Sequence, residues 1–163
     1  MKYLIRTLLA GVMMVSLCAC GGGQDNAAQG KTADINVQSV LDEMLEQVEI
    51  EDPLVLTGTD MLDFFGIKEE DMAEFAAVTC ANGISAQEIV LVKAVDEKSA
   101  ELVEEKLENR LENRMAEFQN YLPEQYDILT ECDVEREGVY VSMILHPQHE
   151  GLEELYDSYF DKD

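Results

Sequence analysis

The chain has 163 residues, with 11 Lys and Arg against 35 Asp and Glu, so its formal charge at pH 7 is −24. Hydrophobic residues make up 47% of the chain, which is enough to bury a real core and argues against wholesale disorder. The acidity argues against a surface for nucleic acid or anionic lipid, because such surfaces need clustered Lys and Arg.

The N-terminal segment has the pattern of a secretory signal. Lys2 and Arg6 precede an almost wholly apolar run over 8–17, which is too short to span a bilayer comfortably but typical of a signal-peptide core. The run ends in Leu17-Cys18-Ala19-Cys20, which resembles a bacterial lipobox. This resemblance implies diacylglycerol attachment to the sulfur of Cys20 and cleavage just before it. The alternatives are an ordinary secretory signal and an N-terminal membrane helix.

Processing would remove residues 1–19, including both basic residues of the signal, and leave 144 residues with a formal charge of −26. Two acyl chains suffice for stable anchoring, so we expect a protein held by its lipid at the extracytoplasmic face of the cell membrane. Residues 20–34 comprise the lipidated Cys20 and a flexible tether rich in Gly, Ala, Gln and Asn, which spans roughly 20 Å as a coil. Residues 35–163 show no second linker and are expected to form one domain.

Two helices are predicted at the start of this domain. Apolar residues between Val37 and Val48 recur at helical spacing, and Pro53 prevents the helix from continuing. A shorter helix is predicted up to Phe65, with position 59 or 60 as its N-cap and Gly66 as its left-handed end.

Two hairpins separated by a long helix are predicted next. Strand-like runs at 75–80 and 88–95 flank the turn dipeptide Asn82-Gly83, which favours the first hairpin. Asp96 is expected to cap a long helix that stops before Tyr121. The second hairpin is predicted over 127–135 and 139–145, and the last helix is predicted from about position 148.

This order of elements predicts an α+β fold. Consecutive hairpins make an antiparallel sheet, and helices with a single apolar stripe can cover one of its faces. We therefore expect a two-layer sandwich: a four-stranded antiparallel sheet, built from two hairpins joined by the long helix, with N- and C-terminal helices. The run Ile89–Val92 is apolar on both faces, so it is expected to be central.

Several short motifs resemble one family of small Gram-positive lipoproteins, the domain of unknown function numbered forty-three fifty-eight. The resemblance covers residues 37–147 and is carried by Asp63–Ile67, Gln87–Ile89, Arg110 and Arg114, Tyr121–Pro123, and Glu137–Val141. The family commonly has an Asp where this chain has Gln87, which weakens the case for a charged site there. No activity is established for the family, so the resemblance implies a fold and no mechanism.

A metal site is the first chemical possibility, although no cofactor is expected. His149 and Glu153 are spaced to share one helix face, and His146 lies close enough along the chain to add a third ligand. The simpler interpretation is a solvent-facing turn, because structural zinc sites usually recruit thiolates at close spacing and none is nearby.

The cysteines and acidic residues offer further possibilities. Cys80 and Cys132 can form a disulfide outside the cell or can be small buried hydrophobic residues, and neither belongs to a recognisable catalytic motif. Glu88 can pair with Arg110 or Arg114 where the strand meets the long helix. The Glu-rich runs lack the spacing of a calcium loop and are interpreted as solvated helix faces.

Two classes of function remain. The first is a non-enzymatic interaction or envelope-accessory module whose partner is another exported protein or a cell-wall component. The second is a lipoprotein that binds a small ligand or cation. An exposed apolar patch favours the first class, whereas an apolar pocket with convergent polar groups favours the second.

Overall fold

The structure is a computed structural model that describes residues 34–161. The predicted signal peptide, Cys20 and all of the predicted tether except Asp34 lie outside the described residues. Within the described part of the chain, no helix is long and apolar enough to cross a membrane.

A five-stranded antiparallel sheet forms the middle of the domain, in the order β1-β2-β3-β5-β4. The sheet therefore has one strand more than the four predicted. Its strands are β1 (Pro53–Val55), β2 (Met72–Cys80), β3 (Glu88–Ala94), β4 (Val134–Glu137) and β5 (Tyr140–Leu145). The helices are α1 (Val37–Gln47), α2 (Gly58–Phe65), α3 (Glu97–Phe118), α4 (Pro123–Leu129) and α5 (His149–Asp157), with a 3-10 turn at Glu69–Asp71.

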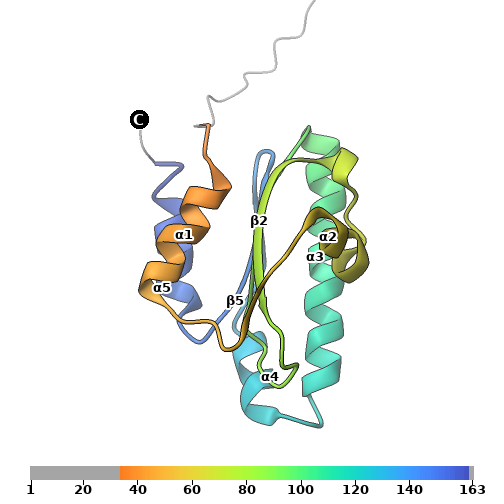
Figure 1. The fold of residues 1–163 in the computed structure, drawn as a ribbon, viewed down its shortest axis with the longest axis vertical. Helices are drawn as coiled ribbons and strands as arrows, with labels where there is room; N and C mark the ends of the chain where they lie inside the picture. Colours follow the sequence, from red (N-terminus) through yellow and green to blue (C-terminus); the bar gives the residue numbers. More distant parts are fainter. Residues whose placement is uncertain (1–33, 162–163) are drawn as a thin grey trace, which may run out of the picture. The chain divides into compact units, whose positions relative to one another are not determined.

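Helices cover both faces of the sheet, so the prediction of two layers is wrong. Figure 1 shows α1 and α5 on one side of the strands and α2 and α3 on the other. Two hydrophobic cores result, one on each face. The central strand β3 divides its side chains between them: Ile89 and Leu91 point to the core under α1 and α5, whereas Val90 and Val92 point to the core under α3. This is why the strand is apolar on both faces.

Local signals explain where the helices begin and end. Asp96 caps α3 as predicted, since its side chain accepts a hydrogen bond from the backbone N–H of Ser99. Helix α2 is capped by Thr57 instead of position 59 or 60. Thr57 and Asp60 form a capping box, in which each side chain accepts from the other's backbone N–H. Gly66 ends this helix with φ of 70°, the left-handed conformation that favours glycine.

One strand and one α-helix were not predicted. Pro53 opens the short edge strand β1, a position that proline tolerates because an edge strand leaves half of its N–H groups unpaired. Pro123 opens α4, where its missing N–H costs nothing. Helix α4 occupies the start of the strand predicted over 127–135, so β4 has only four residues.

Tyr140 joins the two ends of the described chain. Its hydroxyl accepts a hydrogen bond of 2.9 Å from the backbone N–H of Ile35, which precedes α1. Its ring packs edge-to-face against Phe160, which follows α5, with the ring centroids 5.5 Å apart. Both terminal segments therefore lie against the same residue of β5.

Candidate functional site

Glu88, the first residue of β3, is completely buried and fully paired. Its two carboxylate oxygens accept hydrogen bonds of 3.0 and 2.7 Å from Nε and Nη2 of Arg110 in α3. Thr79, opposite Glu88 on β2, donates its hydroxyl to the same carboxylate at 2.9 Å. Burial by itself would lower the pKa of Arg110, but the hydrogen bond and charge of Glu88 outweigh burial and raise it. The pair is a charge-neutral, bidentate contact between sheet and helix.

Arg114, one helical turn further along α3, holds the loop that precedes Glu88. Its Nη2 donates to the backbone oxygen of Ser85 at 2.8 Å, and its guanidinium lies 4.5 Å from the centroid of the Phe118 ring. Its Nε is buried without a hydrogen-bond partner. The side chain of Gln125 in α4 accepts from the backbone N–H of Ala86 at 2.7 Å. Helices α3 and α4 together therefore fix the loop between β2 and β3.

Gln87 points to the other face of the sheet, beside His146. Its side-chain oxygen accepts a 2.7 Å hydrogen bond from the backbone N–H of Glu51, and its Nε2 lies 3.5 Å from His146 Nε2. His146 Nδ1 accepts a 3.0 Å hydrogen bond from the backbone N–H of Gln148, so this nitrogen carries no proton. Burial lowers the pKa of His146 below its ordinary value of 6.5, and the nearby His149 lowers it further. A hydrogen bond to the backbone of Glu49 raises this pKa, but by less than burial lowers it.

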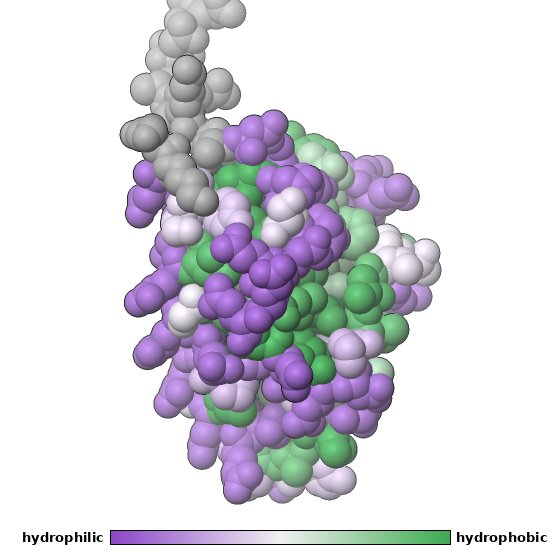
Figure 2. Space-filling model, turned by 60° about the vertical axis from the view of Figure 1, so that its left-hand side comes forward, coloured by the Kyte–Doolittle hydropathy of each residue, from purple (hydrophilic) through white to green (hydrophobic). Residues whose placement is uncertain are grey.

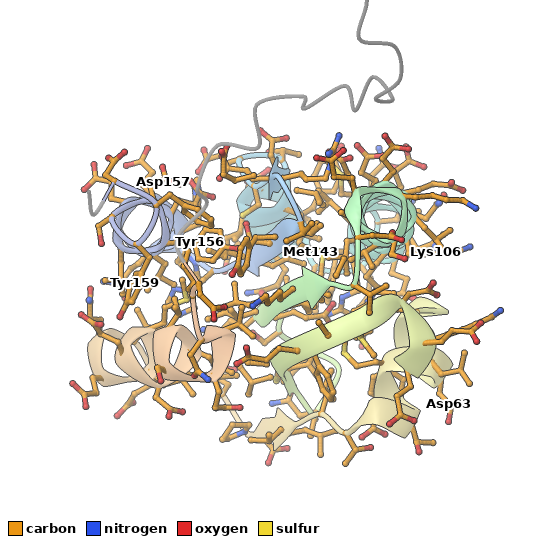
Figure 3. All side chains as sticks on the ribbon, turned by 90° about the horizontal axis from the view of Figure 1, so that it is seen from above. Asp63, Lys106, Met143, Tyr156, Asp157 and Tyr159 are labelled. Atoms are coloured by element: carbon orange, nitrogen blue, oxygen red, sulfur yellow. The ribbon has the colours of Figure 1, made fainter. Side chains whose placement is uncertain are left out.

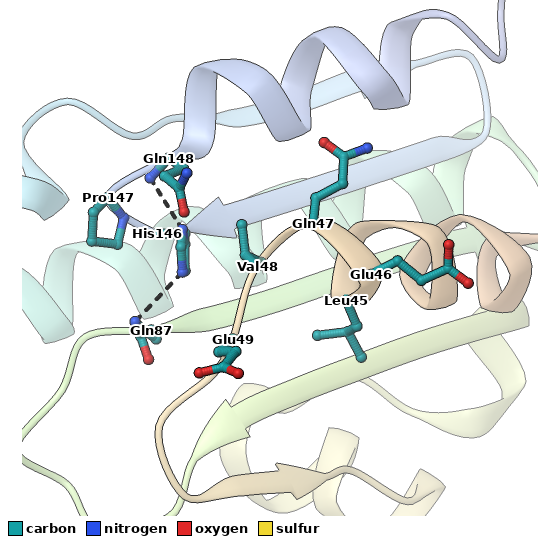
Figure 4. Close-up of a pocket in the computed structure, with 9 residues that line it drawn as sticks. All are labelled: Leu45, Glu46, Gln47, Val48, Glu49, Gln87, His146, Pro147 and Gln148. Atoms are coloured by element: carbon teal, nitrogen blue, oxygen red, sulfur yellow. Dashed lines mark hydrogen bonds between the residues drawn. The ribbon is translucent and has the colours of Figure 1, made fainter.

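His146 lies beside an open hollow of about 630 Å³. Figure 4 shows this hollow between the end of α1, Gln87 and the turn that leads into α5. Its lining is mostly polar, and both imidazole nitrogens of His146 already face protein groups. The hollow therefore lacks the apolar walls with convergent polar groups that are typical of small-molecule sites.

The residues considered for metal binding are only partly brought together. His149 Nδ1 lies 3.1 Å from a carboxylate oxygen of Glu153, as their spacing on α5 predicts. His146 instead makes the separate contacts with Gln87 and Gln148. Within residues 34–161, no three His, Cys, Asp or Glu side chains converge as a metal-binding group.

The two cysteines considered for a disulfide are free, buried thiols on opposite faces of the sheet. Cys80 donates to the side-chain oxygen of Asn82 at 3.0 Å, whereas Cys132, just beyond α4, donates to the backbone oxygen of Ile128 at 3.2 Å. Burial raises the pKa of the Cys132 thiol to about 11, so it is not a nucleophile at neutral pH. The possible bridge between them is not formed, because the sheet separates the two thiols.

The sequence suggested Arg110 or Arg114 as the partner of Glu88, and the structure shows that the partner is Arg110. Arg114 binds the backbone of Ser85 instead, a role that was not predicted, and the contact of Gln125 was missed as well. The four-residue spacing of Arg110 and Arg114 is the signal that places both on one face of α3. No pattern in the sequence indicates Gln125, because its contact depends on the unpredicted helix α4.

The fold and these contacts define an α+β domain whose internal polar groups connect the sheet to its helices. The family described as domain of unknown function (DUF4358) matches residues 46–146. The chain therefore belongs to this family, as the motifs predicted, and the matched segment contains Glu88, Arg110, Arg114 and His146. No curated protein and no solved structure matches the chain in the corresponding comparisons.

Proposed function

We propose that this protein is a lipid-anchored, extracytoplasmic interaction module that binds another exported protein or a cell-wall component and is not an enzyme. The sequence that supports the anchor is the lipobox-like Leu17–Cys20 behind a basic and apolar segment. The observation that favours binding through a surface is a concentration of exposed apolar side chains on β1 and α2.

Four of the eight large hydrophobic residues exposed in the described part of the chain fall within residues 54–64. Leu54 and Val55 lie on β1, an edge strand whose outer side faces no other strand of the sheet. Leu62 and Phe64 lie on α2, which follows directly. Figure 2 shows hydrophobic surface gathering toward one side of the face it displays. Apolar surface next to an open strand edge is a common docking feature for proteins.

The state of the reactive groups supports a role without catalysis. The carboxylate of Glu88 is neutralised by Arg110, and the pKa of the Cys132 thiol is raised to about 11. These groups maintain the fold, whereas a catalytic group usually has a pKa tuned toward the working pH.

The anchor is tested by replacing the thiol. Cys20→Ala should leave the protein unlipidated, either as uncleaved precursor or released from the membrane fraction. Cys18→Ala is the matched control, because it removes a thiol two positions away and leaves a small residue. Processing and membrane retention of Cys20→Ala identical to those of the control would refute the anchor.

The interaction surface is tested by photo-crosslinking in cells. A photoreactive residue at Val55 or Leu62 should give one discrete adduct, while the same residue at the exposed Glu101 on α3 should not. An identical pattern at all three positions would show that residues 54–64 are not a specific contact surface.

A further inference from the structure

A groove lies between the edge strand β4 and the last helix, on the face of the sheet that α5 covers. It has a volume of about 640 Å³ and is lined by Glu135, Arg136, Glu137, Tyr156, Asp157, Phe160 and Asp161. Figure 3 shows Tyr156 and Asp157 where α5 approaches the sheet. No sequence pattern connects these positions, because they lie in separate elements about twenty residues apart.

The groove carries uncompensated negative charge. Four of its residues are carboxylates: Glu135, Glu137, Asp157 and Asp161. Its one cation, Arg136, binds Glu104 of α3 at 2.6 Å. Among residues 34–161, none of the four carboxylates forms an ion pair. Burial raises the pKa of Glu135, and the charges of Asp157, Glu153 and Asp133 raise it further.

A second, independent observation is the hydroxyl of Tyr156. The Tyr156 side chain is only 3% exposed, and its hydroxyl is buried without a hydrogen-bond partner. Tyr156 lines the groove together with Asp157 and Glu135. Burial raises the pKa of its hydroxyl, and Tyr140 and the charges of Asp157 and Glu135 raise it further. An unsatisfied buried polar group in a native fold needs an explanation, and a bound donor is one.

The aromatic side chains add a third component. Phe160 lines the groove and packs edge-to-face against Tyr156, with the ring centroids 5.1 Å apart, while it also contacts Tyr140. Phe160 is half-buried, so part of its ring faces the groove. Carboxylates beside an aromatic ring bind organic cations through charge and through attraction to the ring.

We propose that the groove between β4 and α5 is a binding site for a primary ammonium group on an aliphatic chain. The ammonium donates N–H hydrogen bonds to the carboxylates of Asp157 and Glu135 and to the unpaired oxygen of Tyr156, while the attached methylene groups lie against Phe160. A quaternary ammonium has the same charge but no N–H, so it leaves Tyr156 unsatisfied.

The test is calorimetric titration of the full chain in non-ionic detergent at 0.15 M salt. The probes are 1,5-diaminopentane, a short peptide with one lysine between glycines, tetramethylammonium and calcium. The diamine and the lysine peptide, which carry primary ammonium groups, should saturate at one equivalent. Tetramethylammonium and calcium should bind more weakly and without saturation. Tighter binding of the peptide would identify the source as a protein lysine, and tighter binding of the diamine would identify it as a free amine.

Three variants separate this site from diffuse attraction to an acidic protein. Asp157→Asn and Tyr156→Phe should each weaken ammonium binding at least about tenfold, because each removes a hydrogen bond to a charged group. Glu108→Gln removes the same charge as Asp157→Asn but lies on α3, on the opposite side of the sheet from α5 in Figure 1, and should leave the affinity unchanged. Tyr156→Phe removes only an unpartnered hydroxyl, so its thermal unfolding serves as the check that the fold is intact.

Equal weakening by Asp157→Asn and Glu108→Gln would overturn the proposal in favour of diffuse attraction. Unchanged affinity in Tyr156→Phe, or equally tight binding of tetramethylammonium, would overturn it as well. None of these readouts depends on Cys20 or on residues 54–64, so failure of the proposed function and failure of this site are distinguishable.

Discussion

Arg110 donates one hydrogen bond to each carboxylate oxygen of Glu88, and these two bonds join α3 to the central strand of the sheet. Glu88 has no solvent exposure, while the Arg110 side chain retains 21%. Hydrogen bonds from the Arg110 guanidinium and the Thr79 hydroxyl therefore offset the cost of removing this carboxylate from water. Such a pair is costly to break but contributes little net stability compared with an apolar pair of the same shape.

Breaking this pair should strongly destabilise the protein. Arg110→Met leaves a buried, unpaired carboxylate and should lower the free energy of unfolding by about 3 kcal/mol. The double variant Glu88→Leu with Arg110→Met should recover most of that loss, because it leaves no buried charge. Urea unfolding measures both. Arg136→Met, which breaks the half-exposed pair with Glu104, is the control and should cost less than about 1 kcal/mol. Equal losses in Arg110→Met and in the control would contradict this account.

His146 should make stability depend on pH just below neutrality. Its folded pKa is lowered by burial, while in the unfolded chain it takes up a proton near pH 6.5. The unfolded state therefore binds more protons as the pH falls, so the free energy of unfolding decreases below pH 6.5 until the folded pKa is reached. His146→Gln lacks this contribution. The difference between wild type and His146→Gln, measured by urea unfolding from pH 7.5 to 5.5 at constant salt, should shrink on acidification. A constant or growing difference would show that His146 does not titrate in this way.

Tyr140 should contribute through its hydroxyl as well as through its ring. Tyr140→Phe keeps the aromatic contact with Phe160 but leaves the N–H of Ile35 without this acceptor, so the free energy of unfolding should fall by about 1 to 2 kcal/mol. Amide hydrogen exchange at Ile35 should accelerate in the same variant. Unchanged exchange at Ile35 would mean that another group satisfies this amide.

The described domain should fold without the segment before it. A chain that begins at Ile35 retains both hydrophobic cores and, among the ion pairs of the described residues, loses that of Asp34 with Lys93. Circular dichroism should show mixed helix and strand, with one cooperative thermal transition. A broad, featureless transition would show that the preceding residues contribute to folding.

The sequence predicts the parts of this fold in which a strong local pattern and the tertiary structure agree. The long helix α3, its cap at Asp96 and the central position of Ile89–Val92 are all confirmed. The number of layers was mispredicted because a helical stripe does not say which face of the sheet it covers. The sequence did contain a signal that helices cover both faces of the sheet, because β3 and β5 are apolar on both of their faces.

Proline explains the two missed elements. Pro53 was interpreted as the end of a helix, and no element was predicted to begin at Pro123, yet each is the first residue of a new element. The missing N–H of proline prevents a helix from continuing through it, but the same property suits proline to the first position of a helix or an edge strand. Only the tertiary structure decides between these outcomes. The strand predicted over 127–135 includes Cys132. Because α4 occupies the start of that segment, Cys132 lies between α4 and β4 and not on a strand.

Because Ile35 and Phe160 both contact Tyr140, the two ends of the described domain lie close together, and the domain should tolerate rearrangement of its chain order. A circular permutant that links the residues after Phe160 to those before Ile35 needs only a short connection. New ends placed between Asn82 and Gly83 open an exposed turn and leave all five strands whole. In such a molecule, a tether fused to the new N-terminus leaves the domain at the β2–β3 loop instead of at α1. The permutant therefore offers a way to present the opposite end of the same fold to a partner.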